Sequence, residues 1–104
     1  MKDYFVSMYQ ILKLIEYCSH QDRFDYSLFE EDKLQISDKE LKIILKNILN
    51  EELITGIILF PNLAGFKAVS PQLTTKGYEY LAENSSMKKA YKIAKEIKGW
   101  FPGF

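Results

Sequence analysis

The sequence is poor in the features that mark secreted, membrane and metal-binding proteins. It contains one cysteine, Cys18, and one histidine, His20, in 104 residues. A single cysteine cannot form an internal disulfide bond, as is typical of proteins of the reducing cytoplasm. The chain has no apolar run near the roughly 18 residues of a membrane span, and residues 1–10 lead into no signal-peptidase site. The sequence therefore predicts a cytoplasmic protein without a membrane partner.

Few residues are placed to carry chemistry. Cys18 and His20 are separated by one residue, and no second cysteine or histidine could complete a metal site or a nucleophile–base arrangement. The acidic residues between positions 22 and 32 lack the spacing of a calcium-binding loop, and no glycine-rich phosphate loop is present. We therefore expect no enzymatic activity, no catalytic residues, no metal site and no cofactor.

The formal net charge is zero, so the protein as a whole exerts no general attraction on nucleic acid. The charges are nevertheless unevenly distributed. Residues 1–36 hold four basic and seven acidic side chains, whereas residues 53–104 hold seven basic and three acidic ones. A polyanion would meet the second half of the chain, although the same distribution also suits an ordinary solvated surface.

Length and composition together indicate one folded domain. Hydrophobic residues make up 47% of the chain and charged residues 27%, which is the balance of a globular rather than a disordered protein. A chain of this length can bury a modest core without metals or disulfide bonds. No linker, internal repeat or low-complexity segment divides it, so residues 1–104 are expected to form a single domain.

Residues 37–50 contain the best-defined element of the sequence. Ser37 and Glu40 have the spacing of a capping box, in which each side chain bonds the other residue's backbone N–H. Ile36 and Leu41 flank this box as a hydrophobic staple requires. Apolar residues then recur at the helical spacing that marks one buried face, at Leu41, Ile44, Leu45 and Ile48. This pattern predicts a helix that starts at Ser37 and packs by that face.

The segments before this helix predict a helix-turn-helix pattern. An apolar stripe at helical spacing predicts a helix over residues 4–19, with Gln10 turned away from it. Apolar and polar residues alternate at residues 24–26, which indicates a very short strand. Residues 27–30 form a second capping box, which predicts a short helix over residues 28–34. A short helix followed closely by a well-capped one is typical of a helix-turn-helix.

The segments after it predict a hairpin and further helices. Residues 53–69 are rich in β-branched residues on either side of a turn, so we expect a two-stranded hairpin that ends at residues 70–71. Gly56 inside the first strand indicates a bulge or a close backbone approach. Thr74 is the expected cap of the next helix, and residues 87–98 are expected to form a last one. The predicted fold is α+β and mostly helical: a winged helix, comprising a helix-turn-helix and a hairpin wing, with an added C-terminal helix.

One segment after the wing carries a family resemblance. Residues 73–81 read L-T-x-K-G-x-x-Y-L, a pattern common just after the wing in bacterial winged-helix proteins. Together with residues 82–98, it resembles the YjcQ-like family of small winged-helix proteins from Gram-positive bacteria and their phages. The resemblance implies a winged-helix fold and supplies no catalytic or binding residues. A DNA-binding role is attributed to such proteins from their fold.

The polar face of the predicted helix over residues 37–50 is the candidate DNA-binding site. In a docked winged helix the recognition helix lies in the major groove, where lysines meet phosphates, asparagine reads bases and apolar groups touch thymine methyls. The alternative is an ordinary solvated face, and the wing tip at residues 61–65 has no arginine or lysine. The candidate contacts are Lys39, Lys42, Ile43, Lys46, Asn50 and, beside the wing, Lys67.

The aromatic residues near the C-terminus are a candidate partner interface, because tryptophan and tyrosine anchor such contacts well. They are Tyr91, Trp100, Phe101 and Phe104. Alternatively, the tail folds back on the core. Two functions remain open from the sequence. One is a transcriptional or phage-encoded regulator that binds double-stranded DNA as a homodimer, and the other is a protein–protein interaction module that does not bind DNA.

Overall fold

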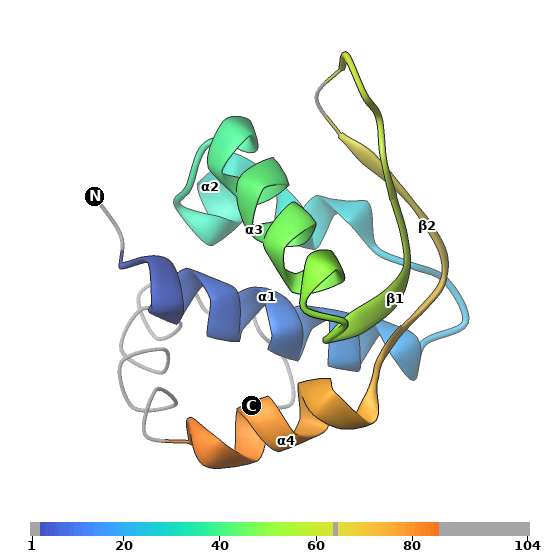
Figure 1. Ribbon diagram of the computed structural model, residues 1–104. Helices are drawn as coiled ribbons and strands as arrows, with labels where there is room; N and C mark the ends of the chain where they lie inside the picture. Colours follow the sequence, from blue (N-terminus) through green and yellow to red (C-terminus); the bar gives the residue numbers. More distant parts are fainter. Residues whose placement is uncertain (1–2, 64, 86–104) are drawn as a thin grey trace.

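The computed structural model describes residues 3–63 and 65–85. Three main helices surround a small core, and a two-stranded hairpin projects beside α3 (Figure 1). The elements in chain order are α1 (Tyr4–Ser19), the 3-10 helix η1 (Tyr26–Phe29), α2 (Glu31–Leu34), α3 (Asp38–Asn50), β1 (Ile54–Leu59), β2 (Phe66–Leu73) and α4 (Thr75–Glu83). This mostly helical α+β arrangement with a wing after the helices confirms the predicted fold. The predicted helix over residues 87–98 lies outside the described residues.

Helix α1 forms the centre of the molecule. It lies between α3 and α4 in Figure 1, and it packs against both β2 and α4. A helix with neighbours on several sides is buried nearly all round. Gln10, predicted to face away from the apolar stripe, is therefore buried, whereas Tyr4 and Phe5 at the start of the stripe are exposed. The buried residues of α1 are Ser7, Met8, Tyr9, Gln10, Ile11, Leu12, Leu14, Ile15 and Cys18.

Helix α3 begins as the capping box predicts. The Glu40 backbone N–H donates to Ser37 Oγ at 3.1 Å, and the Ser37 backbone N–H donates to Glu40 Oε1 at 3.4 Å. The buried residues of α3 are the four predicted from periodicity: Leu41, Ile44, Leu45 and Ile48. Ile36, at the staple position before the cap, is also buried. The local sequence therefore fixes both the start and the orientation of this helix.

The predictions for residues 24–34 were wrong. Residues 24–26 form no strand, and the expected helix over residues 28–34 is split into η1 and the single turn α2 by an extended Glu30. Asp25, rather than Ser27, caps the first turn, since its Oδ1 accepts the Ser27 backbone N–H at 3.0 Å. The Ser27 hydroxyl donates to the same oxygen at 2.5 Å, so it does not serve as the predicted cap.

The hairpin contains the predicted bulge at Gly56 but runs further than predicted. Thr55 pairs with Gln72 and Ile57 with Ala68, so residues 69–71 lie opposite Gly56 alone. Gly56 has a φ of +82°, and a Cβ there would lie 2.6 Å from the Val69 carbonyl oxygen. Pro71 does not end β2 because it falls in this irregular stretch, where no ladder N–H is required.

Candidate functional site

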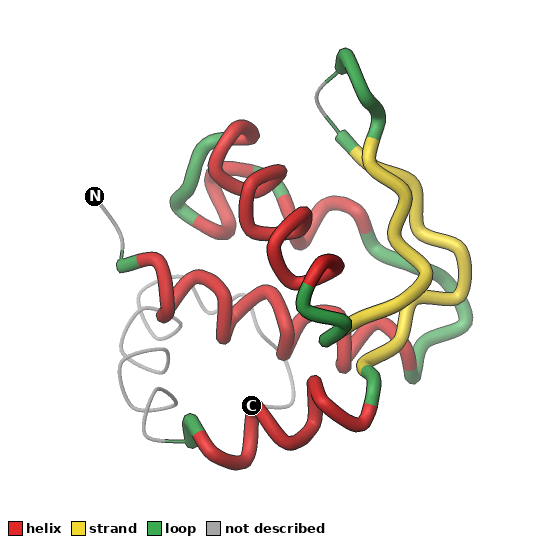
Figure 2. Tube along the Cα trace, viewed as in Figure 1, coloured by secondary structure: helices red, strands yellow, loops and turns green. Residues whose placement is uncertain are grey.

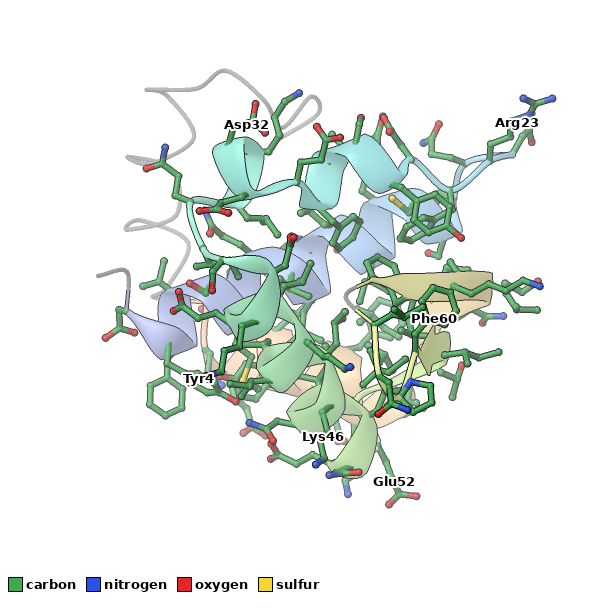
Figure 3. All side chains as sticks on the ribbon, turned by 90° about the horizontal axis from the view of Figure 1, so that it is seen from above. Tyr4, Arg23, Asp32, Lys46, Glu52 and Phe60 are labelled. Carbon is green, nitrogen blue, oxygen red and sulfur yellow. The ribbon has the colours of Figure 1, made fainter. Side chains whose placement is uncertain are left out.

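The side of α3 opposite the core is exposed to solvent. Lys39, Ile43, Lys46 and Asn50, here called the outer stripe, are all exposed. Their spacing of four, three and four residues places them on one face of the helix. Ile43 is 47% exposed, although it is a large apolar residue in a well-packed helix. Figure 3 shows Lys46 pointing away from the body of the protein.

Acidic residues flank the outer stripe at both ends of α3. Asp38 lies in the first turn, and Glu51 and Glu52 follow the last one. Glu52 has a partner, because its carboxylate lies 3.8 Å from Lys76 Nζ on α4. The Glu40 carboxylate is held by Ser37 in the capping box. The outer stripe itself therefore combines two ammonium groups, one amide and one apolar side chain.

Lys42 is engaged within the protein. Its ammonium group donates to the carbonyl oxygens of Phe60 at 2.6 Å and of Leu63 at 3.1 Å, both near the tip of the wing. Lys42 lies on the flank of α3 that faces the hairpin, and it is only partly exposed. We call this contact the helix–wing link. It sets Lys42 apart from Lys39 and Lys46, with which the sequence grouped it.

Replacing Lys42 by methionine is expected to loosen the wing tip with little loss of global stability. Methionine keeps most of the aliphatic stem but cannot donate to the two carbonyl groups. Since the bonds lie at the surface, their loss should cost no more than about 1 kcal/mol. Amide hydrogen exchange at residues 59–66 should accelerate, and the same change at Lys39 should leave these rates unaltered. Equal exchange in both variants would contradict the helix–wing link.

The wing presents an apolar surface. Its tip contains no basic residue, and the strands converge toward it beside α3 (Figure 2). Leu63 is 69% exposed and Ile58 is 53% exposed; Phe60 and Val69 are exposed as well. Lys67, the predicted wing contact, is exposed on β2 and pairs across the hairpin with Ile58. The wing therefore offers one cation within a mainly apolar surface.

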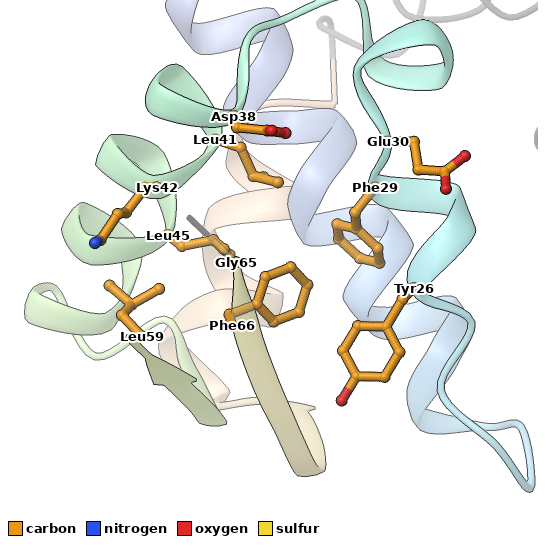
Figure 4. Close-up of a pocket in the computed structure, with 10 residues that line it drawn as sticks. All are labelled: Tyr26, Phe29, Glu30, Asp38, Leu41, Lys42, Leu45, Leu59, Gly65 and Phe66. Carbon is orange, nitrogen blue, oxygen red and sulfur yellow. The ribbon is translucent and has the colours of Figure 1, made fainter. Parts of the chain in front are cut away.

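A cavity of about 330 Å³ lies between α3, η1 and the wing (Figure 4). We call it the α3–wing cavity. Sequence reasoning missed it because its walls come from segments far apart in the chain. The local signal in the sequence was the pair of aromatic residues Tyr26 and Phe29, which lie three residues apart. The lining residues are Tyr26, Phe29, Glu30, Asp38, Leu41, Lys42, Leu45, Leu59, Gly65 and Phe66.

An aromatic cluster forms one wall of this cavity. The rings of Tyr26 and Phe29 lie with their centroids 5.5 and 5.6 Å from that of Phe66 on β2, and Phe24 stacks on Phe29 at 5.1 Å. The Ala68 backbone N–H donates to Tyr26 Oη at 3.0 Å. Side chains of residues 24–29 thus pack against β2, although residues 24–26 were predicted to form a short strand. Aromatic pairs in these geometries stabilise packing beyond their buried area.

A second cavity, of about 510 Å³, is lined by Cys18 and His20 together with polar groups of the α1–η1 loop and β2. Burial raises the pKa of the Cys18 thiol, and the nearby Asp25 carboxylate raises it further, against a hydrogen bond from the Asp25 backbone that lowers it. A thiol that stays protonated at neutral pH is a poor nucleophile. The cavity brings Cys18 and His20 together, but the raised pKa of the thiol does not favour a Cys18–His20 catalytic pair.

The remaining sequence predictions concern metal ions, the membrane and a partner interface, and the described residues bear on the first two. Within residues 3–63 and 65–85, no three histidine, cysteine or acidic side chains are grouped so as to hold a metal ion. None of the helices in this part of the chain has the length and apolar character needed to cross a membrane. The candidate interface residues Tyr91, Trp100, Phe101 and Phe104 lie outside the described residues.

Comparison with known proteins identifies relatives of the chain. The model of the family described as YjcQ protein matches residues 9–100. The YjcQ protein of Bacillus subtilis (strain 168) is 31% identical over 70 residues, which cover 67% of this chain and 74% of the relative. No solved structure matches the chain at a significant level.

Proposed function

The chain belongs to the YjcQ family, and we propose that it binds double-stranded DNA through the outer stripe of α3 as a non-enzymatic, cytoplasmic transcriptional regulator. The observation that carries this proposal is the exposure of Lys39, Ile43, Lys46 and Asn50 on one face of a rigidly capped helix. The winged-helix arrangement presents that helix at the surface. Exposed basic and amide groups on such a helix are suited to a DNA groove.

Each member of the outer stripe has a distinct role in this proposal. Lys39 and Lys46 bind phosphates, which position the protein on the duplex without reading sequence. Asn50 hydrogen-bonds a base edge, with adenine as the preferred partner, and Ile43 contacts a thymine methyl group. Lys42 stays in the helix–wing link and keeps the wing beside α3. Two phosphate contacts per chain give weak binding, so a homodimer that places two stripes on one duplex is part of the proposal.

The test is an electrophoretic mobility shift on duplex DNA of random sequence at low salt. Lys46→Glu should weaken binding about tenfold, or roughly 1.4 kcal/mol, because an attractive phosphate contact becomes repulsive. Arg23→Glu is the matched control, since it changes the charge equally in the loop after α1, far from Lys46 in Figure 3. It should alter affinity less than about twofold. No shift with the wild-type protein, or equal losses in both variants, would contradict the proposal.

A second candidate function is protein–protein contact through the wing. It is favoured by the exposed apolar surface of Ile58, Phe60, Leu63 and Val69 and by the zero net charge. Under this candidate, light scattering should show an assembly for the full-length protein that Leu63→Ser disrupts. A chain ending at Lys98 tests the separate contribution of Trp100 and Phe101. An unaltered assembly in both variants would exclude these surfaces.

A further inference from the structure

The α3–wing cavity has an apolar floor that neither proposed function uses. Its size, about 330 Å³, lies at the lower end of the range of about 300–1,000 Å³ typical of small-molecule sites. Its apolar walls are Phe29, Leu41, Leu45, Leu59 and Phe66. The aromatic rings among them come from η1 and from the start of β2, and the planes of Phe29 and Phe66 meet at 75°, so the cavity has a polarisable side made of one ring face and one ring edge. A further ring that packs edge to face or offset against these rings is stabilised beyond its buried area, which an aliphatic group is not.

The charged groups around the cavity are mainly anionic. Glu30 and Asp38 line the cavity and are exposed, and neither forms an ion pair in residues 3–63 and 65–85. The Lys42 ammonium is already bonded to two wing carbonyl groups, and Figure 4 shows it pointing away from the aromatic rings. A ligand with a positive charge would therefore be attracted by both carboxylates, of which Asp38 is directed toward the cavity and Glu30 away from the aromatic rings in Figure 4. An anionic ligand would be repelled by them.

From this combination we propose that the α3–wing cavity binds a small aromatic molecule that carries a single primary ammonium group. The ring packs against Phe29 and Phe66 among the leucines, and the ammonium group lies at the end of the cavity where Glu30 and Asp38 are found. Tyr26 Oη already accepts the Ala68 N–H, so its own proton remains to donate to a polar substituent on the ring. The proposal does not depend on DNA binding, because the outer stripe lies on a different face of α3.

The experiment uses three probes that share an indole ring and a two-carbon chain. Tryptamine is cationic, indole-3-propionamide is neutral and indole-3-propionate is anionic. Methyl resonances of the full-length protein are followed by NMR during each titration at low ionic strength. Tryptamine should shift the methyls of Leu41, Leu45 and Leu59 and bind at least about tenfold more tightly than the propionate, a difference of roughly 1.4 kcal/mol. The amide should fall between them.

Charge removal separates the proposed site from non-specific attraction. Glu30→Gln/Asp38→Asn should weaken tryptamine binding about fivefold or more and leave the amide unchanged, since each lost charge weakens a partly exposed pair. The control Glu79→Gln/Glu83→Gln removes two exposed carboxylates from α4 and should have no such effect. The proposal is overturned if the three probes bind equally or if no probe saturates these shifts at millimolar concentration. It is also overturned if the same methyls shift with protein concentration alone, because a second copy would then fill the cavity.

Discussion

Gly77→Ala is expected to destabilise the protein by about 3 kcal/mol. Gly77 lies in the first turn of α4, directly against the end of the α3–β1 connection. A Cβ at this position would lie 2.2 Å from the Leu53 carbonyl oxygen. That oxygen accepts the Thr74 backbone N–H at 3.0 Å, so it cannot move aside without breaking a second contact. Helix propensity alone favours alanine over glycine by about 1 kcal/mol, and we expect the clash to outweigh it.

Chemical denaturation of both proteins measures this difference. The control is Glu79→Ala, which places alanine at an exposed position of the same helix and should change the free energy of unfolding by less than about 0.5 kcal/mol. If Gly77→Ala proves as stable as the wild type, α4 does not pack on Leu53 as closely as the structure shows.

The same contacts explain the segment L-T-x-K-G that marks the family resemblance. Leu73 is buried, and Thr74 caps α4 by accepting the Gly77 N–H at 3.1 Å. The Thr74 hydroxyl also donates to the Glu52 carbonyl oxygen at 2.5 Å, and Lys76 lies 3.8 Å from the Glu52 carboxylate. The segment therefore attaches α4 to the end of α3 and the base of the wing. Its role is structural, and it contributes no group to the outer stripe.

Ile48→Ala should cost about 2–5 kcal/mol of stability, whereas Ile43→Ala on the same helix should cost almost none. Ile48 is fully buried in the core, and truncation would leave a cavity beneath α3. Ile43 is 47% exposed on the outer stripe, and alanine is the better helix former. The same chemical change therefore separates the two faces of one helix.

Thermal or denaturant unfolding of the two variants tests this contrast. Ile43→Ala should retain the wild-type stability within about 0.5 kcal/mol, and it should lose affinity for thymine-containing duplexes if the proposed function is correct. Comparable destabilisation by both substitutions would mean that Ile43 is covered, which would remove it from the candidate interface.

Local rules predicted most of the fold. The capping box at Ser37, the periodicity of α3, the bulge at Gly56 and the cap at Thr74 depend on residues close in sequence, and all four were confirmed. The prediction was wrong at residues 24–34, where Ser27 was expected to cap one continuous helix and Asp25 caps the 3-10 helix η1 instead. The Asp25 carboxylate accepts hydrogen bonds from both the backbone N–H and the hydroxyl of Ser27, so the Ser27 hydroxyl does not act as a cap.

The site could be predicted only in outline. Periodicity separated the core face of α3 from its polar face, but Lys42 is directed by carbonyl groups 18 and 21 residues further along the chain. The α3–wing cavity likewise arises where η1, α3 and β2 meet. No spacing rule within one segment could indicate either contact, because both depend on the tertiary position of the wing.

The proposed DNA-binding role of the outer stripe is tested most directly by the salt dependence of duplex binding. Fluorescence anisotropy of a labelled 20-base-pair duplex gives the association constant over a range of salt concentrations, for the wild-type protein and for Lys39→Gln/Lys46→Gln. Each phosphate contact contributes about 0.9 to the slope of log K against log salt concentration. The double variant should therefore show a slope smaller in magnitude by about 1.8 per bound chain. Equal slopes for the two proteins would show that the outer stripe does not contact DNA.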